Sequence, residues 1–269
     1  MKIAKSSKSI LNTVCVLAAF GMLSQSAVQA GTSAKAPVTV TPPPADPFVT
    51  GNLTVTYDTH FVSWGQDIWG AGNSFKDALI HPSMELDFNL GGGFQAYFNT
   101  WWDINDNASS SIGKYIQEID VNVGIYYTVD KLKFQLGYGS WNYASQTEHV
   151  VEGKVTYTSL LNPFIALHGR VADGIPLDTG LVTVIGITPG YKVGPVDLAF
   201  PIAVSADTSG FHGGGAGFGF VSVGISASVP LSKHVVLGAG LTYYHTNSHV
   251  IVNPTEDFLT GSASIGITF

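Results

Sequence analysis

The chain ends with the stretch LTGSASIGITF, which runs from Leu259 to Phe269. Apolar or small residues occupy positions 259, 261, 263, 265, 267 and 269, and Thr or Ser occupies most of the positions between them. Successive side chains of a β-strand point to opposite faces. The stretch therefore predicts a strand with one apolar face and one face lined by hydroxyl groups.

A strand that alternates up to a C-terminal aromatic residue resembles the closing strand of Gram-negative outer-membrane β-barrels. In that family the insertion machinery recognises the last strand and its terminal Phe. The resemblance implies that Phe269 is a membrane-insertion signal and that this machinery is a partner of the chain. It implies a fold class and no particular activity.

The N-terminal residues have the pattern of a secretory signal peptide. Lys2, Lys5 and Lys8 precede an apolar run over 10–23, and small residues follow up to Ala30. The apolar run is short for a span of about 20 residues. We expect cleavage after Ala30, which removes Cys15, the single cysteine. The predicted location is the bacterial outer membrane.

Residues 31–50 form a predicted Pro-rich periplasmic linker. This segment contains Pro37, Pro42, Pro43, Pro44 and Pro47. It has too little apolar surface to bury and is expected to be extended or disordered. It acts either as a passive leader or as a tether to a periplasmic partner. The barrel is predicted over residues 51–269.

The charge balance excludes some classes of partner. The chain has 12 Lys+Arg and 19 Asp+Glu, and three of the lysines belong to the signal peptide. This acidic balance argues against nucleic acid or anionic lipid as a partner. Hydrophobic residues make up 45% of the chain. After residue 30, however, no apolar run approaches 18 residues, which excludes transmembrane helices.

Twelve alternating segments follow residue 51, and a count of ten is the second choice because the segment over 180–191 alternates poorly. Every second joint is a tight turn, and the joints between them are mostly longer and rich in Gly, Ser, Asn and Asp. Short turns at one end and long loops at the other are typical of transmembrane barrels. We therefore predict an all-β, closed antiparallel transmembrane β-barrel of about 12 strands, with short periplasmic turns and longer extracellular loops. The segments lie near 52–62, 78–90, 94–103, 115–128, 131–142, 147–158, 163–172, 180–191, 195–206, 217–230, 233–245 and 259–269.

Charged residues share one face of the predicted strands. A charge that faces lipid at the midplane costs roughly 2–4 kcal/mol, so the charged face must line the interior. Acidic residues dominate the first four strands, and basic residues appear on the fifth to seventh. The predicted lumen-lining residues are Asp58, His60, Glu85, Asp87, Glu118, Asp120, Lys133, Glu152, Lys154, His168 and Arg170.

Two interpretations of this lining stay open. A water-filled lumen with a transverse field would steer small polar solutes. Alternatively, acids and bases pair across a narrow barrel and seal it. Side chains just fill the interior of an eight-stranded barrel, and barrels of 16–18 strands leave a channel. A count of twelve strands therefore does not decide between the open and the sealed interior.

Catalysis and metal binding have little support in the sequence. The run from His245 to His249 vaguely resembles the His-x-Ser-Asn element of lipid A deacylases and outer-membrane phospholipases, but Ser248 lies three residues after His245. A nucleophile and its base must lie within hydrogen-bond distance of each other. We predict no catalytic residues, no metal and no cofactor.

The stretch from Tyr57 to Asp67, YDTHFVSWGQD, is similar to the opening of the Gcw hypothetical-protein family of outer-membrane proteins. The run over 82–88 and the pair Trp101–Trp102 also fit that family. This resemblance implies an outer-membrane barrel without an assigned reaction.

The leading functional prediction is a porin-like channel or solute-binding barrel for small polar solutes, and not an enzyme. A non-conducting structural or adhesive barrel is the alternative, and an outer-membrane lipid hydrolase is a third. The expected partners are outer-membrane lipid and lipopolysaccharide, the insertion machinery and small polar solutes, with no nucleic acid.

Overall fold

The computed structural model describes residues 47–69, 79–143, 146–171 and 179–269. Across these ranges the regular secondary structure is β-strand and includes no helix. Accordingly, no helix in the described part of the chain is long and apolar enough to cross a membrane. The predicted signal peptide and most of the predicted linker lie outside the described residues.

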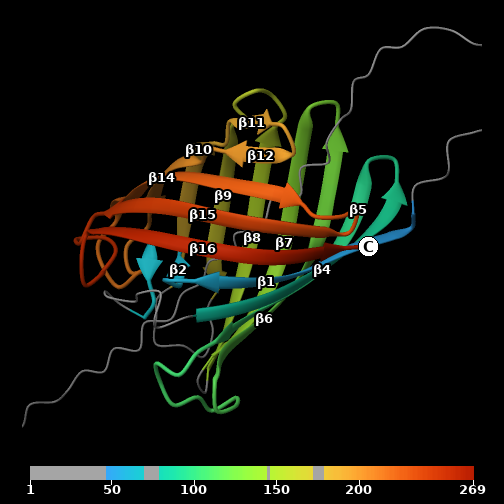
Figure 1. Ribbon diagram of the computed structural model, residues 1–269. Helices are drawn as coiled ribbons and strands as arrows, with labels where there is room; N and C mark the ends of the chain where they lie inside the picture. Colours follow the sequence, from blue (N-terminus) through green and yellow to red (C-terminus); the bar gives the residue numbers. More distant parts are fainter. Residues whose placement is uncertain (1–46, 70–78, 144–145, 172–178) are drawn as a thin grey trace, which may run out of the picture.

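Twelve strands form a closed antiparallel barrel, which confirms the predicted fold class (Figure 1). The strands run in sequence order around the barrel, each paired with its neighbours. They are β1 (Val49–Asp58), β4 (Leu79–Gly91), β5 (Phe94–Ile104), β6 (Ile116–Val129), β7 (Leu132–Tyr143), β8 (Gln146–Tyr157), β9 (Phe164–Val171), β10 (Gly180–Ile187), β13 (Ile202–Asp207), β14 (Gly217–Pro230), β15 (Val235–Thr246) and β16 (Asp257–Thr268).

The first and last strands close the barrel, with Leu53 of β1 opposite Ile267 of β16. Beyond the last pair, Gly51 N–H donates to the Phe269 carbonyl at 2.9 Å, and Phe269 N–H donates to the Gly51 carbonyl at 3.0 Å. The ring of Phe269 covers Gly51, because a Cβ atom at Gly51 would lie 2.7 Å from that ring. The C-terminal residue therefore joins the two ends of the sheet.

Gly51→Val should weaken this closure. The added side chain displaces the Phe269 ring, and overpacking of this kind costs roughly 1–3 kcal/mol. We expect a lower temperature for the heat-induced gel shift of the folded barrel. Gly153→Val is the control, because the nearest atom to a Cβ at Gly153 is 4.0 Å away. Equal shifts in the two variants would show that the Phe269 contact does not stabilise the seam.

Short turns and long loops segregate to opposite ends. The joints at one end, here the turn end, are residues 92–93, 130–131, 158–163, 194–195 and 231–234. Segments at the other end, the loop end, include 59–69, 105–115, 208–216 and 247–256. β1 starts and β16 ends at the turn end, as the even strand count predicts (Figure 1).

A break explains why the segment over 180–191 alternates poorly. β10 stops before Thr188–Pro189, and β13 begins after Phe200–Pro201. Proline cannot donate to a strand ladder, so both strands are interrupted at the same level. Beyond the break, β11 (Gly190–Val193) and β12 (Val196–Ala199) form a hairpin that continues to the turn end, and β12 pairs with β14 there.

The two faces of each strand differ sharply in exposure. On β6, Val121, Val123 and Ile125 are exposed, whereas Asp120 and Asn122 are buried. A water-soluble barrel would bury its apolar face inside. The outer wall of this barrel is therefore the apolar one, as in a barrel that faces lipid.

Several aromatic residues lie on the outer face near strand ends, where Tyr and Trp favour the two membrane interfaces. Trp102 and Tyr243 are exposed toward the loop end, and Tyr157 and Phe269 toward the turn end. Tyr127 is half-buried, because its ring stacks on that of Phe94 at 4.3 Å.

Candidate functional site: a barrel interior closed at the loop end

The interior changes from sealed to solvent-accessible along its length. On β7, the inward side chains of Trp141 and Tyr143 are buried near the loop end, while that of Lys133 is exposed near the turn end. β14 repeats this gradient from Phe220, which is 2% exposed, to the exposed Ser226. We call these regions the sealed half and the open half.

A short hairpin contributes to the sealed half. It consists of β2 (Val62–Ser63) and β3 (Gln66–Asp67), joined by Trp64 and Gly65. Trp64 stacks on His168 of the barrel wall at 4.5 Å, and His168 stacks in turn on Trp141 at 4.8 Å. The hairpin tip is therefore inserted into the barrel.

The hairpin turn requires an unusual backbone. Trp64 has φ of 47° and Gly65 has φ of 96°. The left-handed conformation costs a non-glycine residue about 1–2 kcal/mol. At Gly65, a Cβ atom would lie 2.3 Å from the ring of Phe220 and 2.9 Å from Ile251. The site has no room for a larger residue at Gly65.

One asparagine from the last long loop holds the hairpin by its backbone. Asp67 N–H donates to Asn253 Oδ1 at 2.9 Å, and Asn253 Nδ2 donates to the Gly65 carbonyl at 2.9 Å. The same loop places Val250 and Ile251 in the buried apolar cluster of this half. Segments almost 190 residues apart thus form one plug.

A buried ion pair joins the wall to another loop. Arg170 Nε donates to Glu148 Oε1 at 2.6 Å, and both side chains are almost completely buried. Tyr143 OH donates to the second oxygen of Glu148 at 2.8 Å. Arg170 Nη1 donates to the Phe211 carbonyl at 2.8 Å.

One histidine of the wall lies between two carboxylates, and a second contacts one carboxylate. His81 Nδ1 lies 2.6 Å from Asp58 Oδ2, and its Nε2 lies 3.2 Å from Asp103 Oδ1. His168 Nδ1 lies 2.9 Å from Glu152 Oε1. The residue types predicted for the interior meet here in close pairs.

The predicted lumen residues divide between the two halves. His60 follows the end of β1, because that strand stops at Asp58 and does not continue to residue 62. Arg170 of β9 pairs with Glu148 of the neighbouring strand β8. Half-buried or exposed residues of the open half are Glu85, Asp87, Lys133 and Lys154, and the buried ones of the sealed half include Glu118, Asp120, His168 and Arg170.

In the open half, the two lysines lie over aromatic rings. Lys133 Nζ is 3.8 Å from the centroid of the Tyr126 ring, and Lys154 Nζ is 4.7 Å from that of Phe164. Glu85 and Asp87 lie on β4, which is two strands from β6, the strand of Tyr126, and three strands from β7, the strand of Lys133. This half therefore carries acidic and basic side chains that lie near enough to interact electrostatically.

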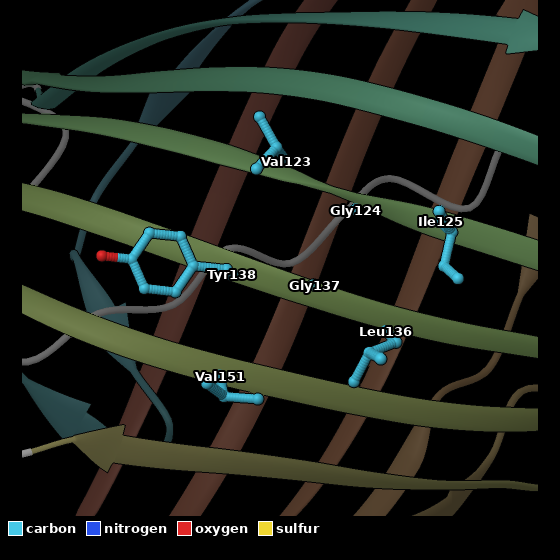
Figure 2. A pocket seen from close by; sticks show the side chains of 7 residues that line it. All are labelled: Val123, Gly124, Ile125, Leu136, Gly137, Tyr138 and Val151. Carbon is cyan, nitrogen blue, oxygen red and sulfur yellow. The ribbon is translucent and has the colours of Figure 1, made fainter.

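A shallow hollow of about 390 Å³ lies on the outer wall across β6, β7 and β8 (Figure 2). Its lining is apolar apart from the hydroxyl of Tyr138. The pleat beneath it contains Gly124 and Gly137, which leave space inside the barrel for the ring of Tyr97. Because the hollow faces the lipid side and lacks reactive groups, it is not the candidate site.

The candidate hydrolase motif has a different arrangement at the outer rim. His245 Nδ1 lies 2.8 Å from Asp257 Oδ1, and Ser248 N–H donates to Glu256 Oε1 at 3.3 Å. A hydrogen bond from Ser248 also lowers the pKa of Glu256. Ser248 is therefore oriented by Glu256, while His245 is oriented by Asp257.

The hairpin carries a titratable group with an altered affinity for protons. Burial raises the pKa of Asp67 to about 7, and burial lowers the pKa of His60, whose Nε2 lies 3.8 Å from Asp67 Oδ2. Inserting the hairpin thus favours a protonated Asp67. The stability that the protonated Asp67 contributes to the inserted hairpin is fully present below about pH 4 and is lost as pH rises through about 7.

Asp67→Asn should therefore stabilise the barrel more at pH 8 than at pH 5. One pKa unit corresponds to about 1.4 kcal/mol, so the gain at pH 8 is of order a few kcal/mol. Unfolding temperatures of the two proteins at the two pH values measure it. Asp197→Asn, at an exposed ion pair, is the control. A gain that is equal at pH 5 and pH 8 would contradict the role of Asp67.

No family model matches the chain, and no curated protein matches it. Its likeness to solved structures concerns the fold. The translocator domain of the autotransporter NalP from Neisseria meningitidis is 12% identical, with 84% of this chain and 90% of that chain covered and a TM-score of 0.46. A KdgM porin is 8% identical (81% and 99% covered, TM-score 0.47). LpxR from Salmonella typhimurium is 11% identical (80% and 99% covered, TM-score 0.44). Membership of the Gcw family stays a prediction.

Proposed function

We propose that the protein is a porin-like barrel of the bacterial outer membrane that admits small polar solutes and is closed by a displaceable plug, the β2–β3 hairpin. The observation that carries this proposal is the insertion of Trp64 against His168 in the sealed half. The open half then faces the periplasm, because the turn end of a barrel lies on that side. Lipid and lipopolysaccharide surround the apolar outer wall.

The energetics of the hairpin support displacement. Four of its buried polar atoms find no hydrogen-bond partner among the described residues: Ser63 Oγ, Trp64 Nε1, Gln66 Oε1 and Asp67 Oδ1. Each buried unsatisfied group costs roughly 1–3 kcal/mol. These groups regain hydrogen bonds to water when the hairpin leaves, which offsets the loss of its stacking and apolar contacts. The inserted state is thus held only weakly.

Liposome swelling tests the proposal. The full chain should let small sugars pass slowly, and deletion of residues 62–67 should raise the rate strongly for small sugars and little for large ones. Equal and negligible rates in both proteins would reject passage and favour a non-conducting structural barrel. The buried Arg170–Glu148 pair is the observation that favours this second candidate, because it holds the sealed half together.

Ion selectivity in the same deletion background tests the open half. Glu85→Gln with Asp87→Asn should lower the preference for cations, because it removes the acids that face the path. Lys133→Met should raise that preference. Reversal potentials in a salt gradient measure both effects. Identical potentials in all the variants would mean that the ions do not pass this part of the wall.

A further inference from the structure

Two lysines of the open half lie close together on neighbouring strands. Lys133 of β7 is opposite Thr156 of β8, and Gln135 of β7 is opposite Lys154 of β8. Lys133 points inward, and residues that are opposite or diagonal across two strands share a face, with diagonal neighbours roughly 7–8 Å apart. The lysines therefore occupy one diagonal of an inward patch, and Gln135 and Thr156 occupy the other. We call these four residues the donor patch.

The donor patch is accessible to solvent. Lys133 is exposed, and Gln135, Lys154 and Thr156 are half-buried. On β7, by contrast, the inward side chain of Trp141 in the sealed half is completely buried. A solute that enters the barrel from the turn end therefore reaches the donor patch before it meets the sealed half.

An aromatic ring supports each lysine. Lys133 Nζ lies 3.8 Å from the centroid of the Tyr126 ring on β6, and Lys154 Nζ lies 4.7 Å from that of Phe164 on β9. The Tyr126 ring is itself stacked on that of Tyr97 at 4.7 Å. The face of an aromatic ring attracts a cation without neutralising its charge. The rings therefore position two ammonium groups that stay fully charged.

The two ammonium groups are not neutralised by the barrel wall. Among the described residues, neither Lys133 nor Lys154 forms an ion pair with a carboxylate. Glu152, which is two residues from Lys154 on the same face of β8, pairs instead with His168 at 2.9 Å. The acids of β4 lie three strands from Lys133 and attract it at longer range. Each ammonium group has three N–H donors, which are therefore available to an acceptor that enters the barrel.

We propose that the donor patch binds the anionic group, a carboxylate or a phosphate, of a small solute. The two ammonium groups donate to different oxygens of that group, and such charge-assisted hydrogen bonds are roughly twice as strong as neutral ones. The amide of Gln135, whose Nε2 also donates to Tyr97 OH at 3.3 Å, and the hydroxyl of Thr156 supply further donors. This inference rests on the proposed function for the passage of the solute, whereas binding itself requires only the open half.

Titration calorimetry of the full chain, folded in detergent and kept at constant ionic strength, tests the site. The probes are glucuronate, glucose 6-phosphate and the neutral sugar glucose. We expect at least one of the two anions to bind at least about tenfold more tightly than glucose, and the tighter anion identifies the group as a carboxylate or a phosphate. Lys133→Met and Lys154→Met should each weaken this binding about tenfold, because each removes a hydrogen bond between charged groups.

Lys131→Met is the matched control, because it removes the same charge from an exposed turn residue whose Nζ lies 6.0 Å from the centroid of the Tyr157 ring, away from the patch. It should leave binding unchanged. Lys133→Arg and Lys154→Arg keep the charge and should retain most of the binding, which separates loss of the site from misfolding. Equal weakening in all three methionine variants, or binding of glucose as tight as that of both anions, would overturn the inference.

The same titration separates this inference from the proposed function. Anion binding that persists in a protein without liposome swelling would reject passage and support the donor patch. Swelling without anion binding would support passage and reject the donor patch.

Discussion

Arg170→Met is expected to lower the free energy of unfolding by about 3–5 kcal/mol, the effect of removing one partner from a buried ion pair. The change leaves Glu148 buried with an uncompensated charge, and it removes the hydrogen bond from Arg170 to the Phe211 carbonyl. Urea unfolding of the barrel in detergent micelles measures the loss.

Two variants distinguish charge from packing. Adding Glu148→Gln to Arg170→Met should restore much of the lost stability, because the double variant has no unpaired charge. Lys192→Met, at an exposed pair with Asp197, should change stability by less than about 1 kcal/mol. Equal effects of Arg170→Met and Lys192→Met would contradict a sealed interior at this level.

Gly65→Val should expel the hairpin. The valine side chain would clash with Phe220 and Ile251, and the backbone of this residue would have to keep a φ of 96°. Overpacking costs roughly 1–3 kcal/mol, and each 1.4 kcal/mol shifts a population about tenfold. We therefore expect the displaced state to increase about tenfold or more, without loss of the twelve-stranded barrel.

A cysteine reporter measures this displacement. Ser63→Cys places a thiol on the hairpin at a position that is completely buried, and the chain's own cysteine lies in the predicted signal peptide. A water-soluble maleimide should label this thiol slowly in the parent and much faster beside Gly65→Val. Gly153→Val, where a Cβ has room, should leave the rate unchanged. Rapid labelling in the parent would mean that the hairpin is not inserted.

Alternation along each strand predicted the barrel because lipid outside and polar groups inside impose a period of two. Residues such as Val123 and Asp120 could be assigned to opposite faces from this period. The pairing of Arg170 with Glu148 could not be predicted in this way, because alternation does not determine the register between β8 and β9. At that register Val150, not Glu148, lies directly opposite Arg170.

The plug was beyond sequence reasoning for a different reason. Trp64–Gly65 is a plausible tight turn in isolation, since glycine favours positive φ. Its insertion, however, depends on Asn253 and His168, which lie more than 100 residues away in the chain. The unequal burial of the inward residues follows from that insertion. The sequence alone therefore could not decide between an open lumen and a sealed one.

Single-channel recording in planar bilayers tests the central claim, that the hairpin closes the loop end of the barrel. The parent protein should remain closed with brief openings, and Gly65→Val should stay open for long periods at the same unit conductance. Steady conductance of the parent, equal to that of Gly65→Val, would contradict closure by the hairpin.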